Sequence, residues 1–343
     1  MKKLLNTLYV LSEDAYLSLD GENVVVNKGK AVAGRFPLHT LQSIEYFGYK
    51  GASPWLMGAC VDRGIDLVFF SPHGRFLARS EGLPNGNVLL RHQQNILCND
   101  VDFAVKTSRN FILGKITNSR WVLERAIRDH RAQVDMEALK KKIAELIEYR
   151  DEARTAKTID ELRGVEGSAA RSYYSVFNEM ILNADETFEF AGRNRRPPKD
   201  PVNAMLSFVY TLLAGDCASA LSGVGLDPYV GFMHVLRPGR KSLALDLMEE
   251  VRPAFADRVV LTCVNNKIVN KSCFREFEDG SVLLNEDGRR KLLEVWQRRK
   301  REKLTHPFLG EKVEWGLVPH VQALLLARHM RGDLDGYPPF IWK

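Results

Sequence analysis

Paired cysteines are missing from this sequence of 343 residues. The five cysteines that it has are scattered and odd in number, without a C-x-x-C pair: Cys60, Cys98, Cys217, Cys263 and Cys273. A disulfide framework uses an even set, and a structural zinc site usually takes closely spaced pairs. The pattern therefore predicts free thiols, a reducing compartment such as the cytoplasm, and no structural zinc.

Long hydrophobic runs are also missing. No apolar stretch approaches the roughly 20 residues that a membrane-spanning helix needs. The segment that begins at Met1 is basic but lacks the apolar core and small-residue cleavage site of a signal peptide. With 45% hydrophobic and 27% charged residues and no internal repeats, the composition is that of an ordinary globular protein without a membrane partner.

Acidic residues are scarce in two basic segments of the C-terminal two thirds, in a chain whose net charge is +6. Residues 289–303 hold eight basic and two acidic residues, and residues 193–199 add four basic ones. Such clusters are typical of a surface that binds a phosphate backbone, although a solvated helix face gives the same pattern. The predicted nucleic-acid contacts are Arg193, Arg195, Arg196, Arg240, Arg298 and Arg299. The run 289–303 is predicted to be amphipathic, with Leu292, Leu293 and Trp296 inward and Arg289, Lys300 and Arg301 outward.

The periodicity changes near residue 88, which predicts an α+β protein of two domains. Residues 1–87 form a small β-rich domain, the predicted platform for dimerisation, and residues 88–343 form a larger helical domain that carries the catalytic site. In the first domain, strands are predicted at 7–11, 16–19, 24–27, 30–37, 44–46, 66–70 and 75–80, with one helix at 54–62.

Helices dominate the second domain. They are predicted at 90–118, 120–130, 136–157, 167–182, 201–214, 243–251, 288–303 and 318–330. The helix that begins at Pro201 has the clearest start, because Asp200 stands at the cap position and proline at the first helical residue. The final segment, 336–343, carries prolines and three aromatic residues, and it is predicted to dock on a surface rather than form a helix.

The segment 231–253 is the best candidate for a functional site. His234 lies in a turn bounded by glycine and proline, and a helical run with Asp246 and Glu249 on one face follows it. Glu166 is the best candidate for a distant further ligand. Three carboxylates and one imidazole suit Mg²⁺ or Mn²⁺ better than structural zinc. The alternative is that the acidic residues are a solvated face and the histidine is only part of a turn.

Other chemical motifs are weaker. The glycine-rich segment 221–231 follows a helix rather than a strand, so a simple loop is favoured over a phosphate-binding loop. Ser168 and Ser172 have no arrangement that suggests a nucleophile and its base. Tyr173, Tyr174 and Tyr210 could stack on bases, but on helices such residues more often belong to the core.

Five motifs in chain order resemble those of the CRISPR-associated integrase of spacer acquisition, the larger subunit of the universal CRISPR adaptation pair. They are Gly-Val-Glu166-Gly, Arg196-Pro-Pro-Lys-Asp-Pro-Val-Asn203-Ala-Met-Leu-Ser-Phe-Val-Tyr210, Gly225-Leu-Asp-Pro, Gly231-Phe-Met-His234 and Ser242-Leu-Ala-Leu-Asp246-Leu-Met-Glu249-Glu-Val-Arg252-Pro. The resemblance covers nearly the whole chain. The length of the chain and the residues of its motifs favour subtype I-C.

The resemblance implies a catalytic metal held by Glu166, His234 and Glu249. It also implies that Asp246 is a supporting acidic group, that Arg252 could contact a phosphate, and that Tyr210 lies near the site. The implied reaction is metal-dependent endonuclease and integrase chemistry. A 3′-hydroxyl of a short DNA fragment attacks the edge of a CRISPR repeat. The implied partners are DNA, a second copy of the chain in a homodimer, and a small adaptation subunit that joins two such dimers into a heterohexamer-type complex.

Two alternatives stay open at this point. The basic helix alone would suit a non-catalytic basic DNA-binding scaffold. The same metal could also serve a hydrolase that acts on a small phosphoester.

Overall fold

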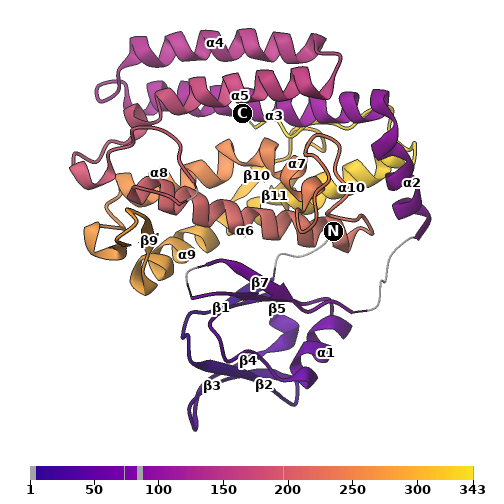
Figure 1. The fold of residues 1–343 in the computed structure, drawn as a ribbon, viewed down its shortest axis with the longest axis vertical. Coiled ribbons are helices and arrows are strands. Elements are labelled where there is room, and N and C mark those ends of the chain that lie inside the picture. Colours follow the sequence, from indigo (N-terminus) through magenta and orange to yellow (C-terminus); the bar gives the residue numbers. More distant parts are fainter. Residues whose placement is uncertain (1–4, 73, 83–87, 196, 343) are drawn as a thin grey trace. The chain divides into compact units, whose positions relative to one another are not determined.

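The computed structural model describes residues 5–72, 74–82, 88–195 and 197–342 (Figure 1). The predicted nucleic-acid contact Arg196 and the predicted domain boundary at residue 87 lie outside these residues. The chain divides into two compact units, one of Met1–Asn85 with Leu284–Arg290 and one of Gly86–Leu283 with Lys291–Lys343. Each unit is described by itself.

In the described residues of its Met1–Asn85 part, the first unit contains two small sheets and one α-helix. Strands β2 (Ala15–Asp20), β3 (Asn23–Lys28) and β4 (Ala31–Pro37) form an antiparallel sheet in that order. The second sheet has the order β1 (Asn6–Val10), β5 (Leu41–Phe47), β6 (Asp66–Phe70) and β7 (Phe76–Arg79). In that sheet β5 pairs in parallel with both β1 and β6, whereas β7 runs antiparallel to β6.

Local sequence explains this arrangement well. Gly21 and Gly29 adopt positive φ angles of 57° and 60° in the two tight turns of the antiparallel sheet, a conformation that glycine adopts without strain. Helix α1 (Pro54–Asp62) begins with Ser53, whose side chain accepts a hydrogen bond from the Leu56 backbone N–H. The prediction of a β-rich region with one helix is confirmed, and the helix bounds agree with those predicted.

The second unit is built from helices, which Figure 1 labels. They are α2 (Val88–Asn99), α3 (Val101–His130), α4 (Met136–Thr155), α5 (Ile159–Ser175), α6 (Pro201–Gly223), α7 (Ser242–Val251), α8 (Arg258–Asn265), α9 (Glu286–Arg301), which begins among residues of the first unit, and α10 (Val318–Met330). The described part of the chain also has two short two-stranded sheets. One pairs β8 (Phe274–Glu276) with β9 (Val282–Leu284), and the other pairs β10 (Lys303–Thr305) with β11 (Lys312–Glu314). Single helical turns lie at Leu38–Thr40 in the first unit and at Asn178–Met180, Glu186–Phe188, Pro253–Asp257, Lys271–Cys273 and Trp315–Leu317 in the second.

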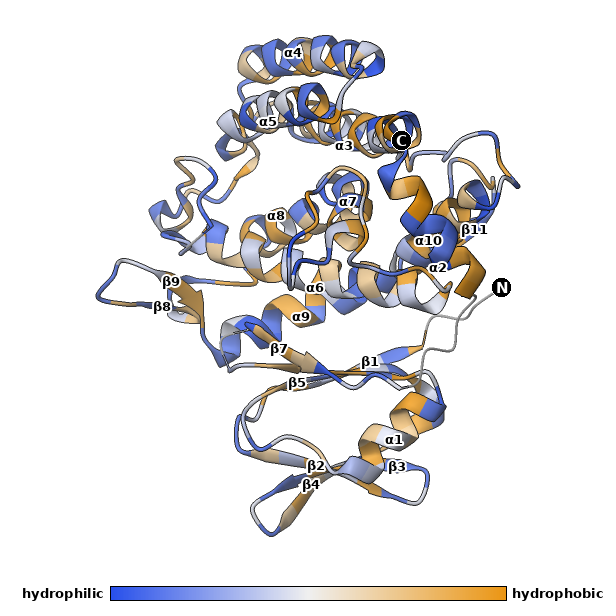
Figure 2. Cartoon of the chain, turned by 45° about the vertical axis from the view of Figure 1, so that its right-hand side comes forward, coloured by the Kyte–Doolittle hydropathy of each residue, from blue (hydrophilic) through white to orange (hydrophobic). Residues whose placement is uncertain are grey.

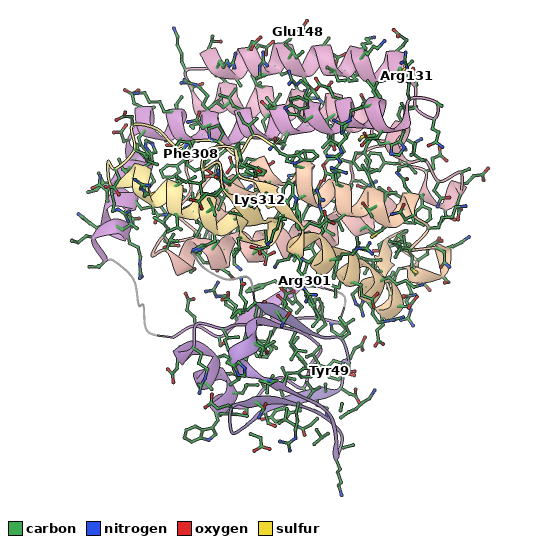
Figure 3. The ribbon with its side chains drawn as sticks, turned by 180° about the vertical axis from the view of Figure 1, so that it is seen from behind. Tyr49, Arg131, Glu148, Arg301, Phe308 and Lys312 are labelled. Atoms are coloured by element: carbon green, nitrogen blue, oxygen red, sulfur yellow. The ribbon has the colours of Figure 1, made fainter. Side chains whose placement is uncertain are left out.

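Helix α7 lies at the centre of this unit. It packs against α3 on one side and α6 on the other, and α4 and α5 run alongside α3 as an outer layer (Figures 1 and 2). The outer face of α4 is polar, and Glu148 on that face is exposed (Figure 3). In contrast, every residue of α7 except Leu245 is buried. The central helix therefore sets its acidic side chains inside the protein rather than on a solvated face.

Several predicted helix bounds were wrong. The predicted helices 90–118 and 120–130 are instead α2 and α3. The chain breaks at Asp100, whose side chain caps α3 by accepting from the Phe103 N–H, and then continues without a second break to His130. Helix α5 begins at Ile159, eight residues before the predicted start, and it ends at Ser175. Glu166 therefore lies within this helix and not at its start. Helix α8 and the two hairpins were not predicted.

Helix α6 is the largest departure from the predicted length. Its start at Pro201 and its Asp200 cap are confirmed, but it continues to Gly223 rather than ending at residue 214. An 18-residue stretch of this 23-residue helix has a mean hydropathy of 1.5, so the helix is long and apolar enough to cross a membrane by length and composition, contrary to the prediction. Since 67% of that stretch is buried inside the protein, the helix fits a core position.

The basic helix α9 also differs from its prediction. Leu292, Leu293 and Trp296 are buried as predicted, but Arg289 and Lys300 are buried too. Lys300 forms an ion pair with Asp216 of α6, with an Nζ–Oδ1 distance of 2.9 Å. Arg301, at the end of α9, is exposed as predicted (Figure 3).

Residues 336–342 of the C-terminal segment form no helix, and the three aromatic residues Tyr337, Phe340 and Trp342 are buried. Glu250 of α7 fixes this segment by two hydrogen bonds. Its carboxylate accepts from the Tyr337 hydroxyl and, at 2.8 Å, from the Phe340 backbone N–H. Asn118 of α3 donates to the backbone oxygens of both Glu250 and Phe340, at 2.6 and 2.8 Å. The segment therefore packs into the core beside α7 rather than only docking on a surface.

Candidate active site

The loop that carries His234 is folded around one carboxylate. Asp246 of α7, which is fully buried, accepts hydrogen bonds from the backbone N–H groups of Phe232, Met233 and His234 at 2.7, 3.1 and 3.0 Å. The His234 ring nitrogen Nδ1 lies 2.6 Å from the same carboxylate. A carboxylate at this position favours the proton on Nδ1, which leaves the lone pair of Nε2 free. Asp246 therefore holds the loop and orients the imidazole.

Gly231 lets this loop approach α7 closely. A Cβ atom at this position would lie 2.7 Å from Asp246 Oδ2 and from the Ser242 backbone carbonyl carbon, and 2.8 Å from the Leu243 backbone nitrogen. Real side chains do not tolerate such distances, so only glycine fits unless the loop moves. The Arg163 guanidinium of α5 fixes the loop from another side by donating to the Met233 carbonyl oxygen.

We expect Gly231→Ala to lower the free energy of unfolding by about 2 kcal/mol, because overpacking against backbone costs roughly 1–3 kcal/mol. The matched control is Gly215→Ala in α6, where a Cβ would meet nothing within 4 Å. That change should raise stability by about 0.5–1 kcal/mol. Urea unfolding of both variants measures the difference. Equal effects of the two changes would contradict the close-approach argument.

Two carboxylates from distant parts of the chain meet at one lysine. Lys115 of α3 forms ion pairs with Glu166 of α5 and with Glu249 of α7, the latter with an Nζ–Oε2 distance of 2.5 Å. The side chains of Lys115 and Glu249 are each 7% exposed, and that of Glu166 is 22% exposed. Because both carboxylates contact a single nitrogen, their facing oxygens lie within about 5–6 Å of each other.

Glu249 is also held by a second cation. The Arg252 guanidinium, one turn along α7, donates to Glu249 Oε1 at 3.0 Å. Burial works to raise the pKa of Glu249, but Arg252, Lys115 and His234 outweigh it and lower the pKa to about 2. Glu249 is therefore ionised over the whole physiological range, as a metal ligand must be.

A buried tyrosine cluster supports Arg252 from behind. The guanidinium lies over the Tyr210 ring, 4.3 Å from its centroid, and donates to the Tyr174 hydroxyl at 3.3 Å. The two tyrosine hydroxyls are 2.6 Å apart, and that of Tyr210 donates to Asp257. Burial, and then the Asp257 charge, raises the pKa of Tyr210 well above its usual value. Tyr210 therefore acts as a neutral platform for Arg252.

The residue types at this site fit a divalent ion. Glu166 and Glu249 offer oxygens that converge on one cation, and His234 offers a free Nε2, a donor set that suits Mg²⁺ or Mn²⁺. As the side chains stand, the described ranges contain no group of three His, Cys, Asp or Glu that lies close enough to hold a metal. The ammonium of Lys115 stands between the two carboxylates instead.

The structure thus brings together most of the predicted site residues. Glu166, His234, Glu249, Asp246, Arg252 and Tyr210 lie on the elements around α7, linked by the contacts given above. Sequence reasoning missed Lys115, Arg163 and Asp257. Arg163 and Asp257 lie near the motif segments, whereas no local signal marks Lys115.

The arginines predicted to contact nucleic acid differ in their exposure and in their partners within the protein. Arg195 and Arg298 are exposed, and Arg240 is partly exposed. Arg193 instead donates to Asn203 Oδ1 at 2.6 Å, and Arg299 pairs with Glu302 and lies over the Trp315 ring. The exposed members are therefore the better candidates for contacts with a phosphate backbone.

Comparison with known proteins identifies the family. The family model described as CRISPR associated protein Cas1 matches residues 8–298. The chain is 49% identical over 347 residues to CRISPR-associated endonuclease Cas1 2 of Rhodospirillum rubrum, covering 100% of both proteins. Among solved structures, it matches a casposase bound to an integration product with a TM-score of 0.85 at 20% identity, over 99% of this chain and 95% of that one. It also matches a chain of a Cas6-RT-Cas1–Cas2 complex with a TM-score of 0.82 at 22% identity, over 100% of this chain and 36% of that one. These two likenesses concern the fold alone, whereas the family match and the sequence identity show that the chain belongs to the Cas1 family.

Proposed function

We propose that this protein is a divalent-metal-dependent DNA endonuclease and integrase of CRISPR adaptation, which inserts short DNA fragments into a CRISPR array. One observation carries the proposal. Glu166 and Glu249, which are 83 residues apart in sequence, converge on a single cation, and Glu249 lies in the field of His234. Membership of a family whose relatives are named CRISPR-associated endonucleases supports DNA as the substrate.

The side chains of this site have distinct roles in the proposed reaction. Glu166, Glu249 and His234 would hold Mg²⁺ or Mn²⁺, which when bound supplies Lewis-acid stabilisation of the charge that builds on the scissile phosphate. Asp246 keeps the Nδ1 proton of His234 in place and so presents Nε2. Arg252 keeps Glu249 oriented and adds a positive charge close to where phosphate charge develops.

The bonds exchanged in the proposed reaction balance without a further reactant. In integration, the 3′-oxygen of the fragment forms a new bond to phosphorus at the repeat boundary. The bond from that phosphorus to the 3′-oxygen of the repeat strand breaks, and the proton of the attacking hydroxyl ends on the leaving oxygen. In the endonuclease reaction, water takes the place of the fragment.

DNA, a second copy of this chain and a small Cas2-type subunit are the proposed partners. The likeness to a casposase bound to an integration product supports DNA, and the likeness to a chain of a Cas6-RT-Cas1–Cas2 complex supports the small subunit. The exposed Arg195 and Arg298 supply positive charge for a phosphate backbone.

A strand-transfer assay tests the proposal. The protein and its partner subunit are mixed with a short fluorescent duplex and a supercoiled plasmid that carries one repeat. We expect joined product with Mn²⁺ or Mg²⁺ and none with a chelator. A duplex that ends in a 2′,3′-dideoxynucleotide is the control, because it lacks the attacking hydroxyl. Salt-sensitive DNA binding without joining would favour the scaffold, and turnover of nucleotides alone would favour a small-phosphoester hydrolase.

A further inference from the structure

Lys115 contacts both Glu166 and Glu249, the two carboxylates that the proposed function assigns to a metal. Its side chain is 7% exposed, and its ammonium pairs with both Glu166 and Glu249. A buried lysine is costly unless its charge is paired, and two carboxylates facing each other repel unless a cation lies between them. Each side of this contact therefore depends on the other.

A charge count gives the consequence for a divalent ion. Among the side chains that pair directly here, Glu166 and Glu249 carry two negative charges and Lys115 and Arg252 carry two positive ones, so these four charges balance. A divalent ion added to these four side chains would bring two further positive charges into a largely buried site. It would also need the oxygens that Lys115 already contacts.

A small pocket beside Lys115 is a poor place for a displaced ammonium. Lys115 lines a small pocket together with Tyr173, Tyr174, Arg252 and Asp257. Asp257, in the turn that follows α7, and the hydroxyl groups of Tyr173 and Tyr174 of α5 are among its polar groups. Apolar side chains such as Ile116 and the like-charged Arg252 also line this pocket, so an ammonium that leaves the carboxylates would move toward solvent rather than into the pocket.

We propose that Lys115 is an internal cation that holds Glu166 and Glu249 together in the metal-free protein and leaves at least one of them when a divalent ion binds. Lys115 is thus a positioning residue that sets the affinity for metal. The inference rests on the proposed function, since it assumes that these two glutamates are metal ligands. It goes beyond that function because it makes metal binding an exchange of one cation for another.

Mn²⁺ titration of the intact protein without DNA, followed by calorimetry, tests the exchange. Lys115→Met removes the competing charge but keeps a long flexible side chain, so it should bind Mn²⁺ more tightly, on the order of tenfold. Lys115→Arg keeps a cation between the carboxylates and should bind Mn²⁺ no more tightly than wild type. Lys300→Met is the matched control, because it removes another buried lysine that pairs with a carboxylate away from the site.

Thermal unfolding supplies a second measurement. In chelator, Lys115→Met should unfold at a lower temperature than wild type, because two buried carboxylates lose their shared cation. Added Mn²⁺ should raise its unfolding temperature by more than that of wild type. If this variant does not fold, amine labelling of wild-type Lys115, measured by mass spectrometry, replaces it, and saturating Mg²⁺ should increase the labelling.

The outcomes separate the two proposals. Equal Mn²⁺ affinity in wild type and Lys115→Met, or labelling of Lys115 that does not change with Mg²⁺, would overturn the exchange and leave the proposed function standing. Tighter binding by Lys115→Arg as well would also overturn it, since packing and not charge would then be the cause. Absence of Mn²⁺ binding in every variant would overturn the metal-dependent function and the exchange with it.

Discussion

Replacement of His234 by alanine should lower strand transfer into a repeat-containing plasmid by roughly 10³-fold or more, since it removes one of three proposed metal ligands. Folding should change little. The imidazole is 18% exposed, and Asp246 keeps its three hydrogen bonds from the backbone N–H groups of residues 232–234. The loss should therefore appear in the rate of joining and not in the yield of folded protein, as a gel assay of joined DNA beside a thermal unfolding curve would measure.

His130→Ala is the control for this prediction. His130 ends α3, is exposed and lies outside the candidate site. It should keep wild-type activity. Normal joining by His234→Ala with Mn²⁺ present would contradict a ligand role for the imidazole. An unfolding temperature well below that of wild type would instead show that His234 mainly holds the loop together.

The sequence was a good guide wherever a signal is local. The alternation in the first eighty residues and the cap at Asp200 predicted strands and a helix start that the structure contains. The spacing of Asp246 and Glu249 placed both on one helix, and the structure adds that both are buried. Their different roles depend on which partner each carboxylate meets, and a helical pattern does not contain that information.

Contacts between residues far apart in the sequence could not be predicted from local sequence patterns. Lys115 is 51 residues from Glu166 and 134 from Glu249, and it stands among ordinary helical residues. A Cβ at Gly114 would lie 2.8 Å from Glu250 Cβ, so this glycine permits the close packing of α3 on α7. The same limit explains why the buried position of Lys300 was missed, since its partner Asp216 lies on another helix.

The stability of the protein should fall as the pH rises from about 5 to 8, in part because of Glu250. Burial raises the pKa of Glu250 to about 7, although hydrogen bonds from Tyr337, Gln322 and the Phe340 backbone N–H oppose the shift. In the unfolded chain the carboxyl loses its proton near its ordinary pKa of 4.5. The folded state thus binds more protons between these two values, and the free energy of unfolding decreases with pH over that window by about 3 kcal/mol.

Glu250→Gln should remove this part of the pH dependence, because the amide does not titrate. At pH 5 the variant and the wild type should agree within about 1 kcal/mol, the worth of one hydrogen bond. At pH 8 the variant should be the more stable of the two by about 2 kcal/mol, since no charge has to be buried beneath the C-terminal segment. Urea unfolding at several pH values measures both differences, with Glu148→Gln on the exposed face of α4 as the matched control.

The difference in the free energy of unfolding between Glu250→Gln and wild type at pH 8 tests whether the pKa of Glu250 is raised. If the Glu250 carboxylate is stabilised by its three donors more than burial penalises it, Glu250→Gln will be less stable than wild type at pH 8, and the raised pKa is wrong. If burial dominates, the charged form loosens the contact between α7 and the segment that contains Tyr337 and Phe340. Protection of the Phe340 amide from hydrogen exchange should then decrease above pH 7 in wild type and stay constant in the variant. Because Glu250 adjoins Glu249, the same contact fixes the helix on which the proposed metal ligand stands.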